Sequence, residues 1–255
     1  MSRNDRGRIQ VGMTRVAIIA AMAGELNPFV QGWSHERRGS VELWRWTFDE
    51  GEWVAACGGA GVNAATRAFA EVERDGPVER VISVGWAGAL HDSLVAGRDY
   101  RLSAVIDART GERFGTGGGQ NVHDGRLLVT SPIVADEAEK QRLASTYKAD
   151  LVDMEAAAIA RLALMREIPF YCVKGVSDGL RDKLPDFNRF IRSDGQFNLT
   201  GMVLFAILRP WYWPGLIRMG ENSKRAALSM RESLLDILDG RGDIRQRNGY
   251  PNSKH

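Results

Sequence analysis

Three carboxylates follow apolar, strand-like runs in this sequence of 255 residues. Glu25 comes four residues after the run that ends at Ala21, and Glu155 belongs to the triplet Asp153-Met154-Glu155. Asp178 directly follows Ser177 at the end of a third run. Ligands of α/β proteins gather beyond the carboxyl ends of the strands, so these acids are candidates for proton transfer or for binding a polar substrate.

Each acid has a chemical and an ordinary interpretation. A carboxyl group with apolar neighbours can stay protonated and donate a proton, but Asp178 also precedes Gly179, where an Asp often caps a turn. Glu155 begins an alanine-rich segment, where a helix start favours an anion that could accept both hydroxyls of a ribose, although acids are common in any first helical turn. Glu25 could act as a base on water or be another such acid.

A glycine-rich turn offers a rival interpretation. Gly59–Ala64 matches the pattern GxGxxA of dinucleotide-binding turns, but it does not follow the first strand, and Glu79, about twenty residues on, precedes a strand. Gly115–Gly119 lacks the Gly-Lys-Ser/Thr ending of a phosphate-binding loop and is predicted to be a mobile loop. The four histidines show no metal-ligand spacing, and no Ser-His-Asp arrangement can be argued. We therefore expect neither a metal nor a cofactor.

Strand-like and helix-like segments alternate along the chain. Strands are predicted at Thr14–Ala21, Val41–Phe48, Trp53–Cys57, Arg80–Val84, Tyr100–Asp107, Leu127–Thr130, Asp150–Asp153 and Pro169–Val176. Helices are predicted near Gly24, at Val62–Arg74, Asp136–Ser145 and Glu155–Glu167, and from Phe197 onward with a break at Arg209–Pro214. This order predicts one α/β domain, a mostly parallel mixed sheet with helices on both faces.

Composition and charge narrow the class of protein. We expect a disordered leader at residues 1–13, the α/β domain at 14–195, a helical extension packed on it at 196–240, and a polar tail at 241–255. The net charge of +2 arises from interleaved acids and bases and does not indicate a nucleic-acid partner. No signal peptide or membrane span is visible. Cys57 and Cys172 lie in apolar runs, and a reduced, cytoplasmic chain is the simpler interpretation, although the two could pair.

Five segments in order resemble the superfamily of purine nucleoside phosphorylases and methylthioadenosine/S-adenosylhomocysteine nucleosidases. VAIIAAMAGEL (16–26) is similar to the family's opening strand and acid, GGAGVNAA (58–65) to its SGIGxxxA turn, and VGWAGAL (84–90) to its TGSAGGL. VDMEAAAIA (152–160) is similar to VEMEAAAIA, and VKGVSD (173–178) to VRAISD. The resemblance covers about residues 15–190 and implies a nucleoside phosphorylase-like fold, with a homo-oligomeric assembly.

The resemblance also implies roles for particular residues. Glu25 would activate the attacking water, Glu155 would bind the ribose hydroxyls, and Asp178, supported by Ser177, would protonate N7 of the departing purine. Other positions with an implied part in substrate binding are Met154 against the sugar, Asp153, Gly59, Trp86 and Ile133, the last in the segment 131–134 expected near the base. The implied reaction is cleavage of the N-glycosidic bond of a purine nucleoside.

Departures from the family pattern affect the choice of acceptor. Gly58 stands where the nucleosidases carry a serine, and Trp86 replaces a small serine, adding bulk or a stacking face. The arginines that hold phosphate in the phosphorylases have no evident counterpart, which favours hydrolysis over phosphorolysis. Phosphorolysis remains the alternative, as do a dinucleotide-dependent oxidoreductase built on Gly59–Ala64 and a non-catalytic nucleoside-binding protein.

A narrower branch is also similar. DMEAAAIARLA, SDGLRDKLPDF and the tail with Arg209-Pro210 resemble hopanoid-associated nucleosidases, which release adenine from adenosylhopane. The aromatic residues of the tail, Phe205, Trp211, Tyr212 and Trp213, could meet a lipidic substrate tail or the inner face of a membrane beside Arg209 and Arg218. Packing in the core or at an oligomer interface is the simpler use of the same aromatics.

Overall fold

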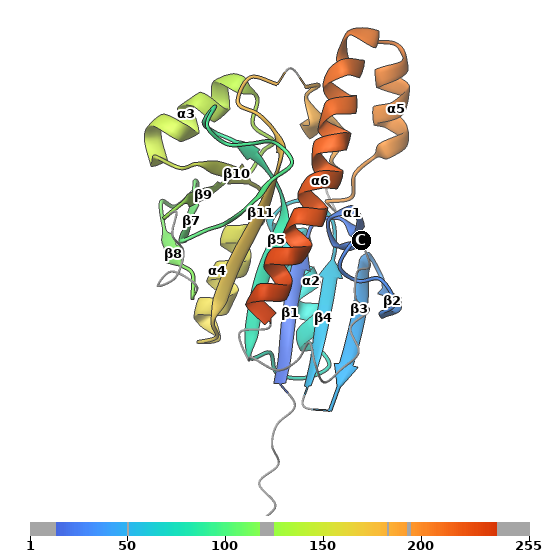
Figure 1. The fold of residues 1–255 in the computed structure, drawn as a ribbon, viewed down its shortest axis with the longest axis vertical. Coiled ribbons are helices and arrows are strands. Elements are labelled where there is room, and N and C mark those ends of the chain that lie inside the picture. Colours follow the sequence, from blue (N-terminus) through green and yellow to red (C-terminus); the bar gives the residue numbers. More distant parts are fainter. Residues whose placement is uncertain (1–13, 50, 118–124, 183, 193–194, 239–255) are drawn as a thin grey trace, which may run out of the picture.

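A computed structural model describes residues 14–49, 51–117, 125–182, 184–192 and 195–238 (Figure 1). The predicted leader at 1–13 and polar tail at 241–255 lie outside the described residues. The strands are β1 (Thr14–Ala20), β2 (Ser34–Arg38), β3 (Val41–Phe48), β4 (Gly51–Cys57), β5 (Arg80–Ala89), β6 (Asp99–Arg101), β7 (Ala104–Asp107), β8 (Arg113–Gly115), β9 (Leu127–Thr130), β10 (Leu151–Asp153) and β11 (Phe170–Asp178). The α-helices are α1 (Ala23–Leu26), α2 (Val62–Glu73), α3 (Glu137–Tyr147), α4 (Ala156–Met165), α5 (Leu199–Ile207) and α6 (Trp213–Leu238), and short 3₁₀ turns occur at Phe187–Phe190 (η1) and Pro210–Tyr212 (η2).

The described strands form one mixed sheet, as predicted. Its order is β2-β3-β4-β1-β5-β10-β9-β7-β8, and β11 pairs with β5 and β6. The pairs of β1 with β4 and β5, of β5 with β11, and of β9 with β7 and β10 are parallel. The other pairs are antiparallel: the three-stranded meander β2-β3-β4, and the pairs β5–β10, β6–β11 and β7–β8.

Helices cover both faces of the sheet. Side chains of β1 alternate between the faces, so Ala17 and Ile19 join the core under α2 and α4, while Val16 and Ile18 join the core under α1 and α6. Figure 1 shows α6 crossing the sheet along β11 and β5, with α2 and α4 behind. The expected α/β fold with a C-terminal helical extension is confirmed.

The differences from the predicted elements have local causes. The predicted strand 100–107 is divided because β6 pairs with β11 while β7 pairs with β9. β5 continues past Gly85 to Ala89, since β11 pairs with it from Val81 to Gly88. β2 was not predicted because its sequence, SHERR, is polar and mostly exposed. β8 was not predicted and ends at Gly115, the first residue of the predicted loop Gly115–Gly119, of which residues 118–119 lie outside the described residues.

The helical extension begins with a projecting hairpin of two helices. Figure 1 shows α5 and the start of α6 extending together beyond the sheet. Large apolar side chains of this hairpin are exposed, among them Leu208 directly after α5 (74%), Trp211 in η2 (68%) and Ile217 in α6 (61%). Within the described residues, no helix is long and apolar enough to cross a membrane.

Candidate active site

The strand β5 changes partners along its length, and this brings the acids together. Its first half pairs with β1 as far as Ile19 with Ser83, whereas Gly88 and Ala89 pair with β10. Because β10 runs antiparallel to β5, its end at Asp153 points back toward the carboxyl end of β1. Glu155 therefore approaches the turn that follows β4, although its strand runs in the opposite direction to β1 and β4.

Glu25 is held by backbone donors. One oxygen accepts hydrogen bonds from the N–H groups of Ala21 and Met22, both at 2.8 Å, and the other accepts from the N–H of Trp86 at 2.7 Å. The residue is only 4% exposed. Burial raises the pKa of Glu25 in spite of these donors and of the nearby Lys174. A carboxyl group fixed in this way with a raised pKa is a stronger base than an ordinary carboxylate.

Glu155 lies at the N-terminal boundary of α4. Its Oε1 accepts a hydrogen bond from the N–H of Gly61 at 2.6 Å, which joins the start of α4 to the start of α2. Burial, together with the neighbouring Asp153 carboxylate, raises the pKa of Glu155 to about 7, although Lys174 acts in the other direction. Burial thus outweighs the effect of the helix start, which from sequence alone favoured the ionised form.

A buried ion pair lies beneath Glu155. Lys174, on β11, contacts Asp153 with an N–O distance of 2.8 Å, and both side chains are almost fully inaccessible. Asp153 also accepts hydrogen bonds from the Thr130 hydroxyl at 2.7 Å and from the N–H of Ala156 at 2.9 Å. Although burial disfavours the ammonium, Asp153 raises the pKa of Lys174. Asp153, predicted to bind substrate, is therefore engaged by the protein itself.

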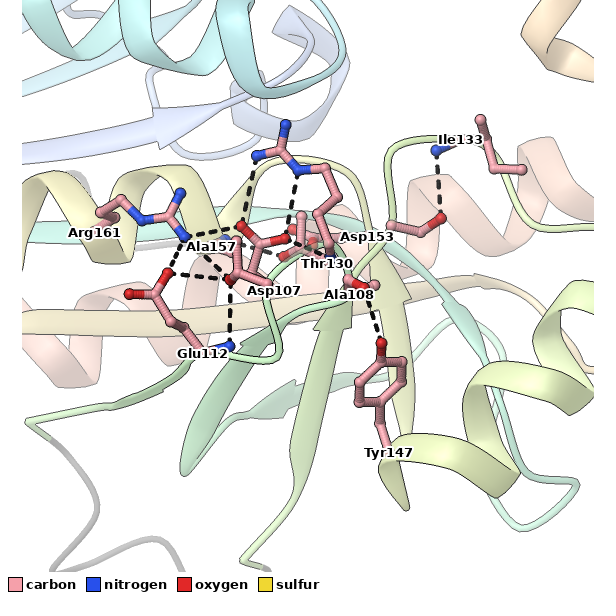
Figure 2. Close-up of polar contacts among 12 residues, drawn as sticks. Asp107, Ala108, Glu112, Thr130, Ile133, Tyr147, Asp153, Ala157 and Arg161 are labelled. Atoms are coloured by element: carbon pink, nitrogen blue, oxygen red, sulfur yellow. Dashed lines mark hydrogen bonds and ion pairs between the residues drawn. The ribbon is translucent and has the colours of Figure 1, made fainter.

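Figure 2 shows polar contacts of Asp107, Thr130 and Asp153, which lie at the ends of β7, β9 and β10. The Thr130 hydroxyl connects Asp153 to the backbone of Ala157, and Asp107 at the end of β7 accepts from Arg161 at 3.0 Å. Burial opposes ionisation of Asp107, but hydrogen bonds from Arg109 and Arg161 lower its pKa. Asp107 is thus held in its ionised form by arginines.

Asp178 lies at the end of β11 and both of its oxygens are engaged. Oδ1 accepts from the Ser177 hydroxyl at 2.6 Å, and Oδ2 forms an ion pair with Nζ of Lys140, which projects from α3. The same Nζ donates to the carbonyl of Gly179 at 2.6 Å. The pair lies against Gly88, where an added Cβ would come within 3.1 Å of Lys140 Cε and 3.2 Å of Asp178 Oδ2. The predicted apolar environment of Asp178 is thus replaced by an ammonium group and a hydroxyl.

The glycine turn after β4 is covered by the segment around Gly195. The N–H of Gly59 donates to Ala21 O at 3.0 Å, and that of Ala60 donates to Gly195 O at 2.8 Å. Gly59 has φ of +109°, and an added Cβ would lie 2.5 Å from Gly195 O, so this close approach requires glycine. Since Gly61 donates to Glu155, these three N–H groups all have protein acceptors.

A cavity lies beside the segment that covers the glycine turn. Its volume is about 510 Å³, and its lining comes from the β2–β3 turn and the segment 192–200, with Arg37 and Arg192 among the lining residues. Neither Glu25, Glu155 nor Asp178 lines it. Gln196 separates it from the glycine turn, because its amide donates to Gly58 O at 2.9 Å. We therefore place the site at the acids.

The other residues predicted to bind substrate lie in three different surroundings. Met154 is partly exposed beside Glu155 and is available to a ligand there. The Trp86 indole donates to Ser223 O at 3.0 Å and contacts Gly24, so it holds α6 against α1. From the sequence, Trp86 was expected to add bulk or a stacking face near the site, and the structure engages its N–H with α6. Ile133 is 47% exposed in the loop after β9, and the neighbouring Val134 is paired with Asn188 of η1 in both directions.

Two lysines at the site were not predicted. Lys174 could have been recognised from the sequence, since a charged residue within the apolar run 170–176 needs a buried counter-ion. Lys140 could not have been recognised, because it lies in a polar helix whose other charged residues face solvent. Within the described residues, these are the cations that pair with acids of the site. The same residues contain no cluster of His, Cys, Asp and Glu suited to a metal, and Cys57 and Cys172 are buried and unpaired.

Comparison with known proteins gives a family match for part of the chain. The sequence model of the phosphorylase superfamily matches residues 98–200. This part of the chain is therefore similar to the phosphorylase superfamily. The matched range contains Lys140, Glu155, Lys174 and Asp178, whereas Glu25 precedes it. No curated protein matches the sequence.

Several solved structures of nucleosidases and of a hydrolase share the fold. A methylthioadenosine/S-adenosylhomocysteine nucleosidase from Helicobacter pylori is 16% identical, with a TM-score of 0.66 over 89% of this chain and 99% of that one. The enzyme of the same name from Neisseria meningitidis, in complex with methylthio-immucillin-A, is 20% identical, with a TM-score of 0.64 over 88% and 98%. Futalosine hydrolase of Helicobacter pylori is 15% identical, with a TM-score of 0.65 over 89% and 98%. These structures show that the fold implied by the five segments is present, and the family model matches the part of the chain that holds the last two of those segments.

Proposed function

We propose that the protein is a purine nucleosidase that hydrolyses the N-glycosidic bond of an adenine nucleoside. The observation that carries this proposal is the position of Glu25, Glu155 and Asp178 at the ends of β1, β10 and β11, the order in which the resemblance places them. The fold shared with nucleosidases supports it. Each acid is fixed by hydrogen bonds, as preorganised catalysis requires.

The proposed chemistry divides the work among the three acids. N-glycoside cleavage passes through an oxocarbenium-like state, so the rate depends on neutralising the departing base and tolerating a cationic sugar. Asp178 and its partners would act on the base, and Glu155 would bind the ribose hydroxyls. Glu25 would take a proton from the attacking water.

The backbone donors favour water over phosphate as the acceptor. In a site that binds phosphate, free N–H groups and arginines supply the positive potential. Here the N–H groups of Ala21, Met22 and Trp86 are already directed at the Glu25 carboxylate. A phosphate dianion placed beside Glu25 and Glu155 would meet like charge instead. Phosphorolysis is therefore the second candidate.

The same reasoning weakens the dinucleotide alternative. A GxGxxA turn binds pyrophosphate through unoccupied backbone N–H groups at a helix start. In this chain the N–H groups of Gly59, Ala60 and Gly61 donate to Ala21, Gly195 and Glu155. Titration with NADH, followed by fluorescence, tests this directly, and binding below millimolar concentration would revive the oxidoreductase alternative.

For the substrate, we propose adenosylhopane, on the strength of the narrower resemblance. The exposed apolar side chains of α5 and α6 support a lipidic substrate or a membrane surface. From residue 195 to residue 220 the chain has two arginines, Arg209 and Arg218, and no acid, a composition suited to an anionic lipid surface. The same apolar face could instead serve a homo-oligomer, the assembly that the resemblance implies, and sedimentation with and without lipid vesicles distinguishes the two uses.

Base release is the test of the proposed function. The purified protein is incubated with adenosine, methylthioadenosine and adenosylhopane, each with and without phosphate, and free adenine is measured. We expect adenine without phosphate, and a rate of release about 10²–10⁴-fold lower from the Asp178→Asn variant. Strict dependence on phosphate would make the protein a phosphorylase. No release from any substrate by the unmodified protein would refute an enzymatic function and favour a nucleoside-binding protein.

A further inference from the structure

The cavity beside the cover of the glycine turn contains two arginines without a described counter-ion. We propose that this cavity is a second binding site, for a phosphate group, separate from the site at the acids. Its described lining includes none of Glu25, Glu155 and Asp178. This inference goes beyond the proposed function and does not depend on it.

Arg37, the first of these arginines, lies in β2. Its neighbour Arg38 forms ion pairs with Glu36 and Asp75, both at 2.8 Å. Because side chains alternate along a strand, Arg37 points away from these acids. Its Nε donates to Gly39 O at 3.1 Å, and the other four N–H donors of the guanidinium have no acceptor among the described residues. Arg37 is therefore able to bind an anion.

Arg192, the second arginine, belongs to the segment that covers the glycine turn. Its backbone is fixed, because its N–H donates to Gln196 O at 3.0 Å and its carbonyl accepts from the N–H of Gly195 at 2.9 Å. Its side chain is exposed and forms no ion pair or hydrogen bond with a described residue. No described residue of the lining is acidic, since the members other than the two arginines are Gly39, Ser40, Gln196, Phe197, Asn198 and Thr200.

The donors favour a phosphate group over a carboxylate. Guanidinium groups form paired hydrogen bonds with oxyanions, and here one comes from the β2–β3 hairpin and one from the segment 192–200. A tetrahedral phosphate has enough oxygens to accept from both, whereas a carboxylate has two oxygens in one plane. The hydroxyls of Ser40 and Thr200 are further donors in the lining. The volume of about 510 Å³ lies in the range of small-molecule sites, about 300–1,000 Å³, so the phosphate can belong to a larger molecule.

A phosphate group in this cavity would join two parts of the fold. The carbonyl of Gly195 accepts from the N–H of Ala60 at 2.8 Å, and the N–H of Gly195 donates to Arg192. A group bound by both Arg37 and Arg192 would therefore fasten the cover of the glycine turn to the edge hairpin of the sheet. Because the acids do not line the cavity, phosphate bound there would not be transferred to the sugar.

The cavity also lies at the start of the projecting hairpin. Asn198 and Thr200, at the beginning of α5, belong to its lining. α5 has nine residues and is about 13 Å long, and the exposed Leu208 and Trp211 follow its far end. Two sources of phosphate fit this position. One is a free phosphate compound, and the other is the headgroup of an anionic lipid whose acyl region meets the apolar residues of the hairpin.

Binding is tested by isothermal titration calorimetry of the purified protein with sodium phosphate, against sodium chloride at equal ionic strength. We expect Arg37→Gln and Arg192→Gln each to raise Kd by about tenfold or more, the effect of losing a charge-assisted hydrogen bond. The double variant should lose detectable binding. Arg142→Gln/Arg181→Gln is the matched control, because these arginines are 56% and 73% exposed and do not line the cavity.

Thermal melting gives a second readout of the same binding. At a phosphate concentration tenfold above Kd, Tm should rise by about 3–6 °C in the unmodified protein and in the control double variant. The double variant of the cavity should show no rise.

Sedimentation with vesicles distinguishes the two sources of phosphate. The vesicles contain phosphatidylglycerol and phosphatidylcholine, in a buffer without free phosphate. If a lipid headgroup occupies the cavity, the vesicle-bound fraction of the cavity double variant falls below that of the control double variant. If the cavity takes a free phosphate compound, the two double variants bind vesicles equally and differ in calorimetry.

The inference is overturned if the two double variants differ neither in phosphate affinity nor in vesicle binding. Phosphate would then bind elsewhere on the protein or not at all. None of these measurements uses a nucleoside, so this failure would leave the proposed function intact. Conversely, a protein that releases no base but binds phosphate through Arg37 and Arg192 would keep the cavity site and lose the proposed function.

Discussion

Breaking the buried pair of Lys174 and Asp153 is the perturbation whose cost the structure best defines. In Lys174→Met the alkyl part of the side chain is largely preserved, but Asp153 loses its counter-ion at 2.8 Å in a site closed to water. Removing one partner of a buried pair typically costs about 3–5 kcal/mol. Because Asp153 keeps its hydrogen bonds from Thr130 and Ala156, we expect the lower value, about 3 kcal/mol.

The assay is the free energy of unfolding from urea titration, supported by thermal melting. For a chain of this size, a loss of about 3 kcal/mol corresponds to a fall in Tm of about 6–12 °C. Lys174→Met/Asp153→Asn removes the uncompensated charge and should recover part of the loss. Arg181→Met is the control, since Arg181 and Asp92 form a pair at 2.7 Å with side chains 73% and 58% exposed, worth about 0–1 kcal/mol.

The result that would refute this reasoning is equality between the two single variants. If Lys174→Met cost no more than Arg181→Met, the ammonium group would not be compensating a buried carboxylate. The account of how Glu155 is held at the site would then fail too, because Lys174 is the cation that opposes the raised pKa of Glu155.

Three further predictions concern the acids and their turn. The pKa of Glu155 is raised to about 7, so the folded chain keeps a proton that the unfolded chain loses above about 4.5. Glu155 should therefore make the free energy of unfolding fall as the pH rises from about 4.5 to 7, by at most about 1.4 kcal/mol per pH unit. Urea titrations at several pH values should show a smaller slope in Glu155→Gln. An unchanged slope would exclude Glu155 as its source. Asp178→Asn should lower kcat for adenine release by about 10²–10⁴-fold, and a smaller loss, measured by chromatography of free adenine, would remove Asp178 from the chemistry. Gly59→Ala should lower Tm, because its Cβ would lie 2.5 Å from Gly195 O at φ of +109°, whereas Gly220→Ala, with no atom within 4 Å, should not; equal Tm values would contradict the close approach.

The sequence predicted most of the fold because its signals were local. Runs such as Val41–Phe48 and Leu127–Thr130 were predicted with the bounds that the structure has, since β-branched and apolar residues mark buried strands. The strand Ser34–Arg38 was not predicted because it is polar and, among the described strands, pairs with β3 alone. The division of 100–107 into two strands depends on partners distant in sequence, which no local pattern contains.

The candidate acids were also found from sequence, but their surroundings were not. Glu25, Glu155 and Asp178 were selected by their place after strands and by resemblance. Nothing local indicated that Asp178 would face an ammonium group, because Lys140 is 38 residues away and lies in a polar helix. Nor could the sequence show that Trp86 would be bound to α6 through Ser223.

By itself, the sequence determined the alternation of elements, the acids at their ends and the resemblance to a superfamily. Those features follow from the polarity and order of neighbouring residues, which the chain carries before it folds. Only the tertiary structure decided which partner each charge meets. β10 runs antiparallel to β5 and turns Glu155 toward Gly61, α3 places Lys140 on Asp178, and β11 places Lys174 under Asp153. Because burial and charge partners set protonation states, the chemistry of the acids is a property of that packing.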